Sequence, residues 1–137
     1  MPACLRMPAC LRMTKPFGIL LISGGHERAH YAFMLAAGAA AVGRQVVLFA
    51  TNGGCRALLR DWSGLADARH DADVRARGVA GLDELRAAAA ELGVRLLACD
   101  AGLLMAGVDP ALLLPHAEVA GIPTFLTAVG AGQIVTL

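Results

Sequence analysis

The most constraining feature of this sequence is a strand, helix, strand pattern in its first half. Residues 17–23, "FGILLIS", form a continuous apolar run closed by two glycines, which is typical of a strand buried on both faces. Residues 26–41 then predict a long alanine-rich helix ended by Gly43, and residues 45–50, "QVVLFA", predict a second buried strand. Buried strands joined by a helix pair in parallel through a right-handed crossover.

The same theme continues to the end of the chain. We expect, in order, a helix at 82–92, a third strand at 94–98, a short helix within 109–121, a fourth strand at 123–128 and a short last strand around Val135. Residues 61–81 are polar and charged without a clean period, so we expect a long loop with one helical turn there. The sequence therefore predicts a three-layer α/β/α, flavodoxin-like domain with a mostly parallel sheet of about five strands.

The beginning of the chain stands apart from this pattern. "MPACLR" occurs at residues 1–6 and again, unchanged, at 7–12. Cys4 and Cys10 in the two copies suggest metal binding or a disulfide, but no histidine or further cysteine joins them. We therefore interpret residues 1–14 as a disordered, duplicated tail and residues 15–137 as a single domain, the number expected for 137 residues.

Composition excludes several function classes. Twelve basic residues against eleven acidic ones give a net charge of +1 without a basic stripe, which argues against a nucleic-acid partner. No run reaches the roughly 20 apolar residues of a membrane span, although peripheral association stays open. With 57% hydrophobic residues, a small domain is expected to self-associate. Four cysteines without a disulfide framework or transport signal suggest the cytoplasm.

Candidate site residues follow the predicted strands, because ligands of an open parallel sheet bind outside the carboxyl ends of its strands. The residues in these positions are Ser23, Gly24, Gly25 and His26 after the first strand, Thr51, Asn52, Gly53 and Gly54 after the second, Cys99 and Asp100 after the third, and Thr127 after the fourth. The glycines form turns and would let backbone approach a bound group closely. They do not match a nucleotide-binding glycine motif.

Cys99 is the strong nucleophile among these residues. If a short helix begins near Gly102, Cys99 lies at its amino end, where free N–H groups and the helix dipole favour a thiolate. The alternative is a small apolar core residue, because free cysteines are often buried. We expect Asp100 to cap the helix, and Met105 either to fill the core or to line the pocket of Cys99.

Two further features carry alternatives. His26 and His30 have a metal-compatible spacing, yet no third ligand is placed beside them, so we expect solvated or capping histidines and no metal. Cys55 is expected to be a buried helical residue. A redox pair with Cys99 requires that the ends of the second and third strands be neighbours.

Taken together, these segments resemble the DsrE/DsrF/DsrH-like sulfur-relay family, some members of which carry a peroxiredoxin family name. The resemblance runs through "AAGAAAVGRQVVLFATNGG", "ELGVRLLACDAGLLMAGV" and "AEVAGIPTFLTAV" and covers nearly all of residues 17–137. Its most specific part is the cysteine after a strand, followed by a small-residue turn, a methionine and a glycine. The repeat at 1–12 has no counterpart in the family.

The resemblance implies a sulfur carrier or sulfurtransferase that holds sulfane sulfur as a persulfide on Cys99. It also implies a homotrimer or homohexamer and partner proteins that donate and accept sulfur. We expect the substrate contacts to come from Gly24, Gly25, Asn52, Gly53, Asp100, Gly102 and Met105, and no metal or organic cofactor to be required.

Two other functions remain in view. The first is a non-catalytic, oligomeric module that binds a small anion or nucleotide at the same strand ends. The second, a thiol peroxidase, fits less well, because the chain lacks the proline and threonine context of that active site and shows no evident resolving cysteine.

Overall fold

The computed structural model describes residues 15–137 and is built on one five-stranded sheet. The strands are β1 (Phe17–Leu21), β2 (Val46–Ala50), β3 (Arg95–Cys99), β4 (Ala117–Ala120) and β5 (Gln133–Thr136), in the order β4-β3-β2-β1-β5. All neighbouring pairs are parallel. The predicted parallel α/β architecture is therefore confirmed. The predicted tail at 1–14 lies outside the described residues.

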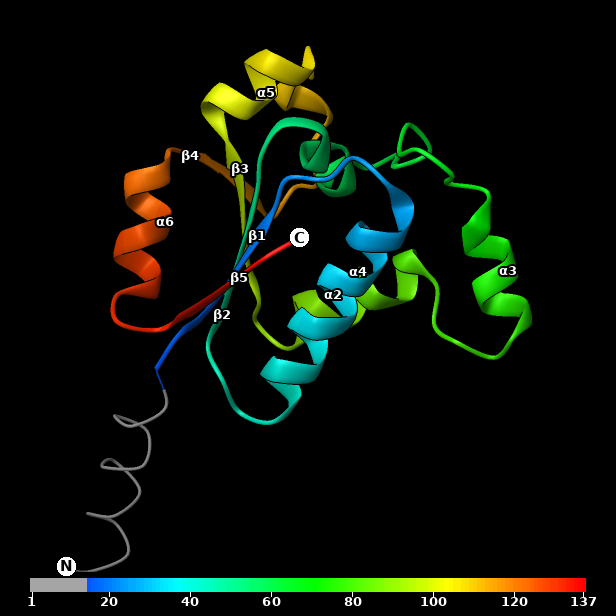
Figure 1. Cartoon of the computed structure of the whole chain (residues 1–137), viewed down its shortest axis with the longest axis horizontal. Coiled ribbons are helices and arrows are strands. Elements are labelled where there is room, and N and C mark those ends of the chain that lie inside the picture. The colour runs from blue at the N-terminus through cyan, green and yellow to red at the C-terminus, as the bar shows by residue number, and fades with distance from the viewer. Residues whose placement is uncertain (1–14) are drawn as a thin grey trace, which may run out of the picture.

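Helices cover both faces of this sheet. They are α2 (His26–Ala41), η1 (Asn52–Leu58), α3 (His70–Ala76), α4 (Leu82–Glu91), α5 (Asp100–Ala106), η2 (Pro110–Leu112) and α6 (Ile122–Val129), of which η1 and η2 are 3-10 helices. Figure 1 shows α2 and α4 on one face, α6 on the other, and α5 beyond the carboxyl end of β3. One layer of the domain is thus a single short helix.

The helix α6 packs on the sheet through aromatic and aliphatic contacts. Phe125 stacks on Phe49 of β2 with ring centroids 4.9 Å apart. Gly18 of β1 permits the close approach, because a Cβ there would lie 2.6 Å from Cγ2 of Val129. Leu97 and Cys99 of β3 complete this smaller core cluster. The third layer is therefore held by a small set of side chains.

The prediction of a fourth strand at 123–128 is wrong, because these residues belong to α6. Pro123 occupies the first turn, where proline is favoured, and Gly130 follows the last residue of the helix. The true β4 lies inside 109–121, where the only helix is η2. It is a partly exposed edge strand and lacks the continuous apolar run of a central strand. Thr127 consequently does not follow a strand.

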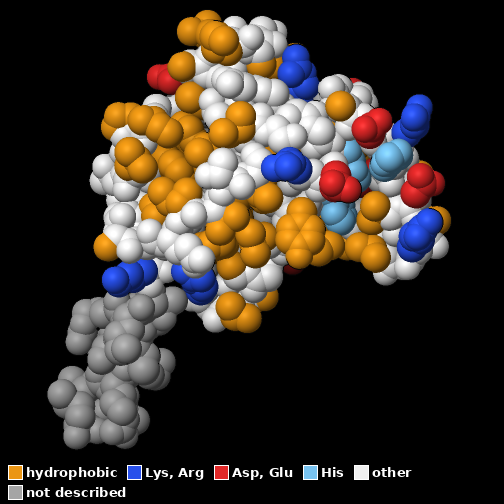
Figure 2. Space-filling model, viewed as in Figure 1, with side chains coloured by type: hydrophobic (Ala, Val, Ile, Leu, Met, Phe, Trp, Pro, Cys, Tyr) orange, Lys and Arg blue, Asp and Glu red, His pale blue; other side chains and the backbone are white. Residues whose placement is uncertain are grey.

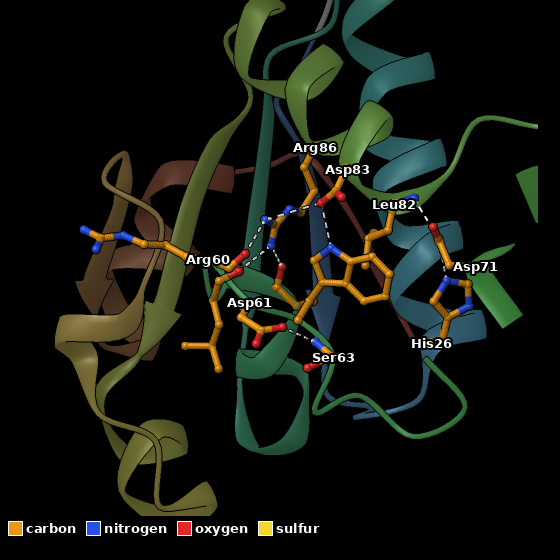
Figure 3. Close-up of polar contacts among 11 residues, drawn as sticks. His26, Arg60, Asp61, Ser63, Asp71, Leu82, Asp83 and Arg86 are labelled. Carbon is orange, nitrogen blue, oxygen red and sulfur yellow. Dashed lines mark hydrogen bonds and ion pairs between the residues drawn. The ribbon is translucent and has the colours of Figure 1, made fainter. Parts of the chain in front are cut away.

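The segment 61–81 contains α3 and is fastened to α2 and α4 by buried polar groups (Figure 3). Asp71, only 5% exposed, accepts hydrogen bonds from Nε2 of His26 and from the backbone N–H of Leu82, both at 2.8 Å. His30 is paired with the carbonyl of Ala80 at 2.8 Å. The expectation of solvated or capping histidines is therefore wrong, since both rings are buried and make tertiary contacts.

A second set of polar contacts joins the residues after η1 to α4. The indole N–H of Trp62 donates to Asp83 at 2.7 Å. The buried guanidinium of Arg86 donates to the carbonyls of Ala57, Leu59 and Arg60. Figure 3 shows both contacts beside the His26–Asp71 pair. The long connection is therefore ordered by hydrogen bonds rather than by an apolar periodicity.

The charge of Asp71 is favoured by its partners. Burial by itself raises the pKa of this carboxyl. The hydrogen bonds from His26 and Leu82, together with the charges of His26 and Arg75, outweigh burial and lower the pKa. A carboxyl with a lowered pKa in the folded state stabilises the fold above its unfolded pKa, and this contribution is lost as the pH falls through the folded value.

We predict that Asp71→Asn lowers the free energy of unfolding by about 2 kcal/mol at neutral pH, because hydrogen bonds to a charged acceptor are lost. The difference from the unchanged protein should shrink below about pH 4, where the aspartate itself becomes protonated. Urea unfolding at several pH values measures both effects. Asp73→Asn, at an exposed position of the same helix, is the matched control. Equal losses in the two variants would contradict the prediction.

Candidate functional site

Cys99 is the last residue of β3 and the N-cap of α5. Its Sγ accepts a hydrogen bond from the backbone N–H of Gly102 at 3.3 Å. The residue lies at the carboxyl edge of the sheet and is buried, with 8% of its surface exposed. The helix predicted to begin near Gly102 starts earlier, at Asp100, with Cys99 immediately before it.

Asp100 does not cap this helix, contrary to expectation. It is the first residue inside α5, and its exposed carboxylate accepts from the N–H of Ala101 at 2.7 Å. Both carboxylate oxygens also lie within 4 Å of where a Cβ of Gly121 would stand, just before α6. The prediction failed because the preceding cysteine already supplies the capping acceptor. Asp100 therefore lies beside the thiol, between the starts of two helices.

Three of the glycines predicted to contact a ligand bring backbone segments close together. Gly24 and Gly53 face each other so closely that a Cβ on Gly24 would lie 3.1 Å from Cα of Gly53. Gly102 packs on the next turn, where its Cβ would lie 2.8 Å from Cα of Thr51 and 2.5 Å from the backbone nitrogen of Asn52. The fold thus joins the ends of β1, β2 and β3 in one row. Direct ligand contact by these residues stays a prediction.

Two other predicted contact residues are Gly25 and Met105. Gly25 is the N-cap of α2, and its backbone bridges to Ala66. Met105, in α5, is 78% exposed rather than packed in the core, and its neighbour Leu104 is exposed as well. Whether Met105 contacts a substrate stays a prediction.

Cys55 is fully buried in η1, which confirms the expectation of a buried helical residue. Its Sγ lies 3.5 Å from the carbonyl oxygen of Ala50, at the end of β2. Burial raises the pKa of Cys55 to about 11, and the negative charge of a Cys99 thiolate acts in the same direction. Because β2 pairs with β3, the condition that the sequence left open is met, and the two cysteines lie at neighbouring strand ends.

The described part of the chain holds two free thiols, Cys55 and Cys99. Within residues 15–137, no group of three or more histidine, cysteine, aspartate or glutamate side chains is arranged to hold a metal ion. Both free cysteines of this part are at the carboxyl edge. No helix among the same residues is long and apolar enough to cross a membrane. Cys4 and Cys10 lie outside the described residues.

The His26–Asp71 pair was missed by sequence reasoning. The two residues are 45 positions apart, and Asp71 lies in a charged stretch without period, so no local signal links them. By contrast, the local sequence was sufficient to predict the position of Cys99. This residue follows an apolar run and precedes a turn that contains Gly102, a pattern typical of the end of a buried strand.

Known structures share this architecture. The crystal structure of the ychN protein from E. coli matches with a TM-score of 0.68 and 12% identity, over 90% of this chain and 99% of that one. A protein of unknown function, MTH1491 from Methanobacterium thermoautotrophicum, matches with a TM-score of 0.56 and 16% identity over the same shares. At these identities the likeness shows the fold alone.

Comparison of the sequence itself gives the family. No curated protein matches the chain. The model of the DsrE/DsrF-like family, however, matches residues 15–137, the whole part that carries the sheet and Cys99. The chain therefore belongs to the DsrE/DsrF-like family.

Proposed function

We propose that this protein is a sulfur carrier that holds sulfane sulfur as a persulfide on Cys99 and passes it to an acceptor. The observation that carries the proposal is the position of Sγ, at the carboxyl edge of the sheet and within 3.3 Å of the Gly102 N–H. Membership of a family linked to sulfur relay supports it.

The chemistry requires little beyond this thiol. A Cys99 thiolate attacks the outer sulfur of a donor persulfide, the donor sulfur–sulfur bond breaks, and the donor leaves as a thiolate. Transfer to an acceptor thiolate reverses these roles and regenerates Cys99. Electron pairs move only between sulfur atoms, so the step needs no metal or organic cofactor. A protein that repeats this cycle acts as a sulfurtransferase.

The surroundings of Cys99 suit a carrier more than an exposed reactive thiol. Cys99 belongs to the apolar cluster that includes Leu97 and Phe125, while 8% of the residue reaches solvent. Donor and acceptor would then reach it by docking at the carboxyl edge. Because thiols must stay reduced for this chemistry, we keep the cytoplasm as the expected location.

We also propose that the protein self-associates as a homotrimer or homohexamer through the apolar surface around α5, β4 and α6. Exposed large side chains gather there, and Figure 2 shows hydrophobic groups over α6 and at the tip formed by α5. They are Leu104, Met105, Val119, Ile122 and Leu126. A soluble monomer rarely exposes a contiguous apolar surface of this kind. Because the surface flanks Cys99, a partner copy would narrow access to the sulfur.

The persulfide prediction is tested by incubation with a polysulfide donor and intact-mass analysis. We expect one added sulfur per chain, removed by reductant. Cys99→Ser should abolish the added mass, whereas a Cys4→Ser/Cys10→Ser chain should retain it. Sulfur that persists on the Cys99→Ser chain would contradict the assignment. If the unchanged chain takes up no sulfur, and the Cys99→Ser chain binds a nucleotide or small anion as well as the unchanged chain does, the binding-module alternative is favoured.

The assembly prediction is tested by sedimentation velocity at several concentrations. We expect the unchanged chain to sediment as a trimer or hexamer. Leu126→Asp should weaken association at least about tenfold, since a charge would be buried without a partner. Val42→Asp, at an exposed apolar position that ends α2, is the matched control and should leave the assembly intact. A monomeric unchanged chain would overturn the prediction.

A further inference from the structure

The second cysteine of the domain, Cys55, stands next to the backbone of the proposed sulfur carrier. Its Sγ is 3.5 Å from the Ala50 carbonyl, and Ala50 pairs with Ala98, the residue immediately before Cys99. η1, which carries Cys55, packs against both β3 and α5. The two thiols therefore belong to one small region of the carboxyl edge.

We propose that Cys55 is a resolving thiol that attacks Sγ of Cys99 once Cys99 carries a second sulfur group, closing a Cys55–Cys99 disulfide and expelling that group. For a persulfide, this inference rests on the proposed function. The resolving step itself requires only that Cys99 be in a sulfur–sulfur bond.

The reaction balances without an external oxidant. A new bond forms between the two Sγ atoms, while the bond from Cys99 Sγ to the outer sulfur breaks and its electron pair leaves with that sulfur. Two thiol sulfurs are thereby oxidised to a disulfide and the sulfane sulfur is reduced to sulfide. The proton of the Cys55 thiol ends on the departing hydrosulfide. The bound sulfur is thus released as sulfide instead of passing to an acceptor.

Closing this bond requires Cys99 to turn. Its side chain packs with the cluster beneath α6, whereas Cys55 packs with the larger cluster on the α2 and α4 face. Cys99 is the last residue of β3, and α5 begins directly after it. Beyond Cys99, therefore, the strand does not continue between the two clusters. Closure would therefore break the contact between the Gly102 N–H and the Cys99 sulfur, and would require the turn from β3 into α5 to shift toward η1. The loss of that contact opposes closure.

The rate of closure should depend steeply on pH. The attacking species is a thiolate, and burial raises the pKa of Cys55 to about 11. The titratable groups that act on it are Arg56 within η1, whose charge opposes the rise, and Cys99 on β3, whose charge raises the pKa further only while Cys99 is a free thiolate. Only a small fraction of Cys55 is therefore reactive at neutral pH. A persulfide on Cys99 survives there and is discharged faster in alkali.

An aryl disulfide, 5,5′-dithiobis(2-nitrobenzoate), tests the step without relying on persulfide chemistry. Attack by Cys99 releases one thionitrobenzoate and leaves a mixed disulfide, and attack by Cys55 then releases a second. The full chain carrying Cys4→Ser/Cys10→Ser, treated with one equivalent of reagent, should release two thionitrobenzoates per chain. Its mass should fall below that of the reduced chain by two hydrogen atoms. Peptide mapping should recover Cys55 linked to Cys99.

The kinetics and the matched variants sharpen this test. The second release should accelerate about tenfold per pH unit between about pH 7 and pH 9. Adding Cys55→Ser should leave one release and a lasting adduct on Cys99, and adding Cys99→Ser should remove the fast release. One release with a stable adduct on the chain that retains Cys55 would overturn the proposal. Absence of any release would also overturn it, because the step requires an accessible Cys99.

The two proposals fail separately. If the disulfide closes but the Cys55→Ser chain, which cannot discharge a persulfide by closure, takes up no sulfur from polysulfide, the carrier function is refuted and the resolving thiol stands. If the chain takes up sulfur from polysulfide but keeps a stable aryl adduct on Cys99, the resolving thiol is refuted and the carrier function stands.

Discussion

The contact between Gly102 and the backbone of Thr51 and Asn52 determines how the carboxyl edge of this protein is built. A Cβ on Gly102 would lie 2.5 Å from the Asn52 nitrogen, so any other residue would force the first turn of α5 away from the end of β2. With glycine, the turn lies directly on the neighbouring strand end. The Gly102 N–H is then directed at the Cys99 sulfur, and η1 is held against β3, with Cys55 inside it.

The unequal covering of the sheet explains a second set of properties. Two helices bury one face, whereas α6 alone packs on the other through Phe125 and Val129. Apolar side chains on α5, β4 and α6 are left exposed close to the thiol. In a protein that self-associates as we propose, the same surface would hold the assembly and limit access to Cys99. The assembly and the sulfur chemistry would then depend on the same helices.

Sequence patterns predicted the strands whose residues are continuously buried, and they failed for elements whose residues are only partly buried. β1, β2 and β3 are the central strands, and their uninterrupted apolar runs identify them. β4 is a short edge strand without such a run. The apolar residues of α6 predicted a strand in its place, although Pro123 is typical of the first turn of a helix. α3 was missed as a full helix because its anchor is a polar cluster around Asp71, which leaves no apolar period to read.

By itself, the sequence determined the parallel α/β plan, the long helix after β1 and the place of Cys99 at a strand end, because each follows from local burial and from the residues that end a strand or helix. Only the tertiary structure decided that Cys55 neighbours Cys99, that the glycines bring turns together, and that His26 pairs with Asp71. These relations depend on strand order and on contacts between residues far apart in the chain. Local spacing does not encode such contacts, since they arise only when the sheet assembles.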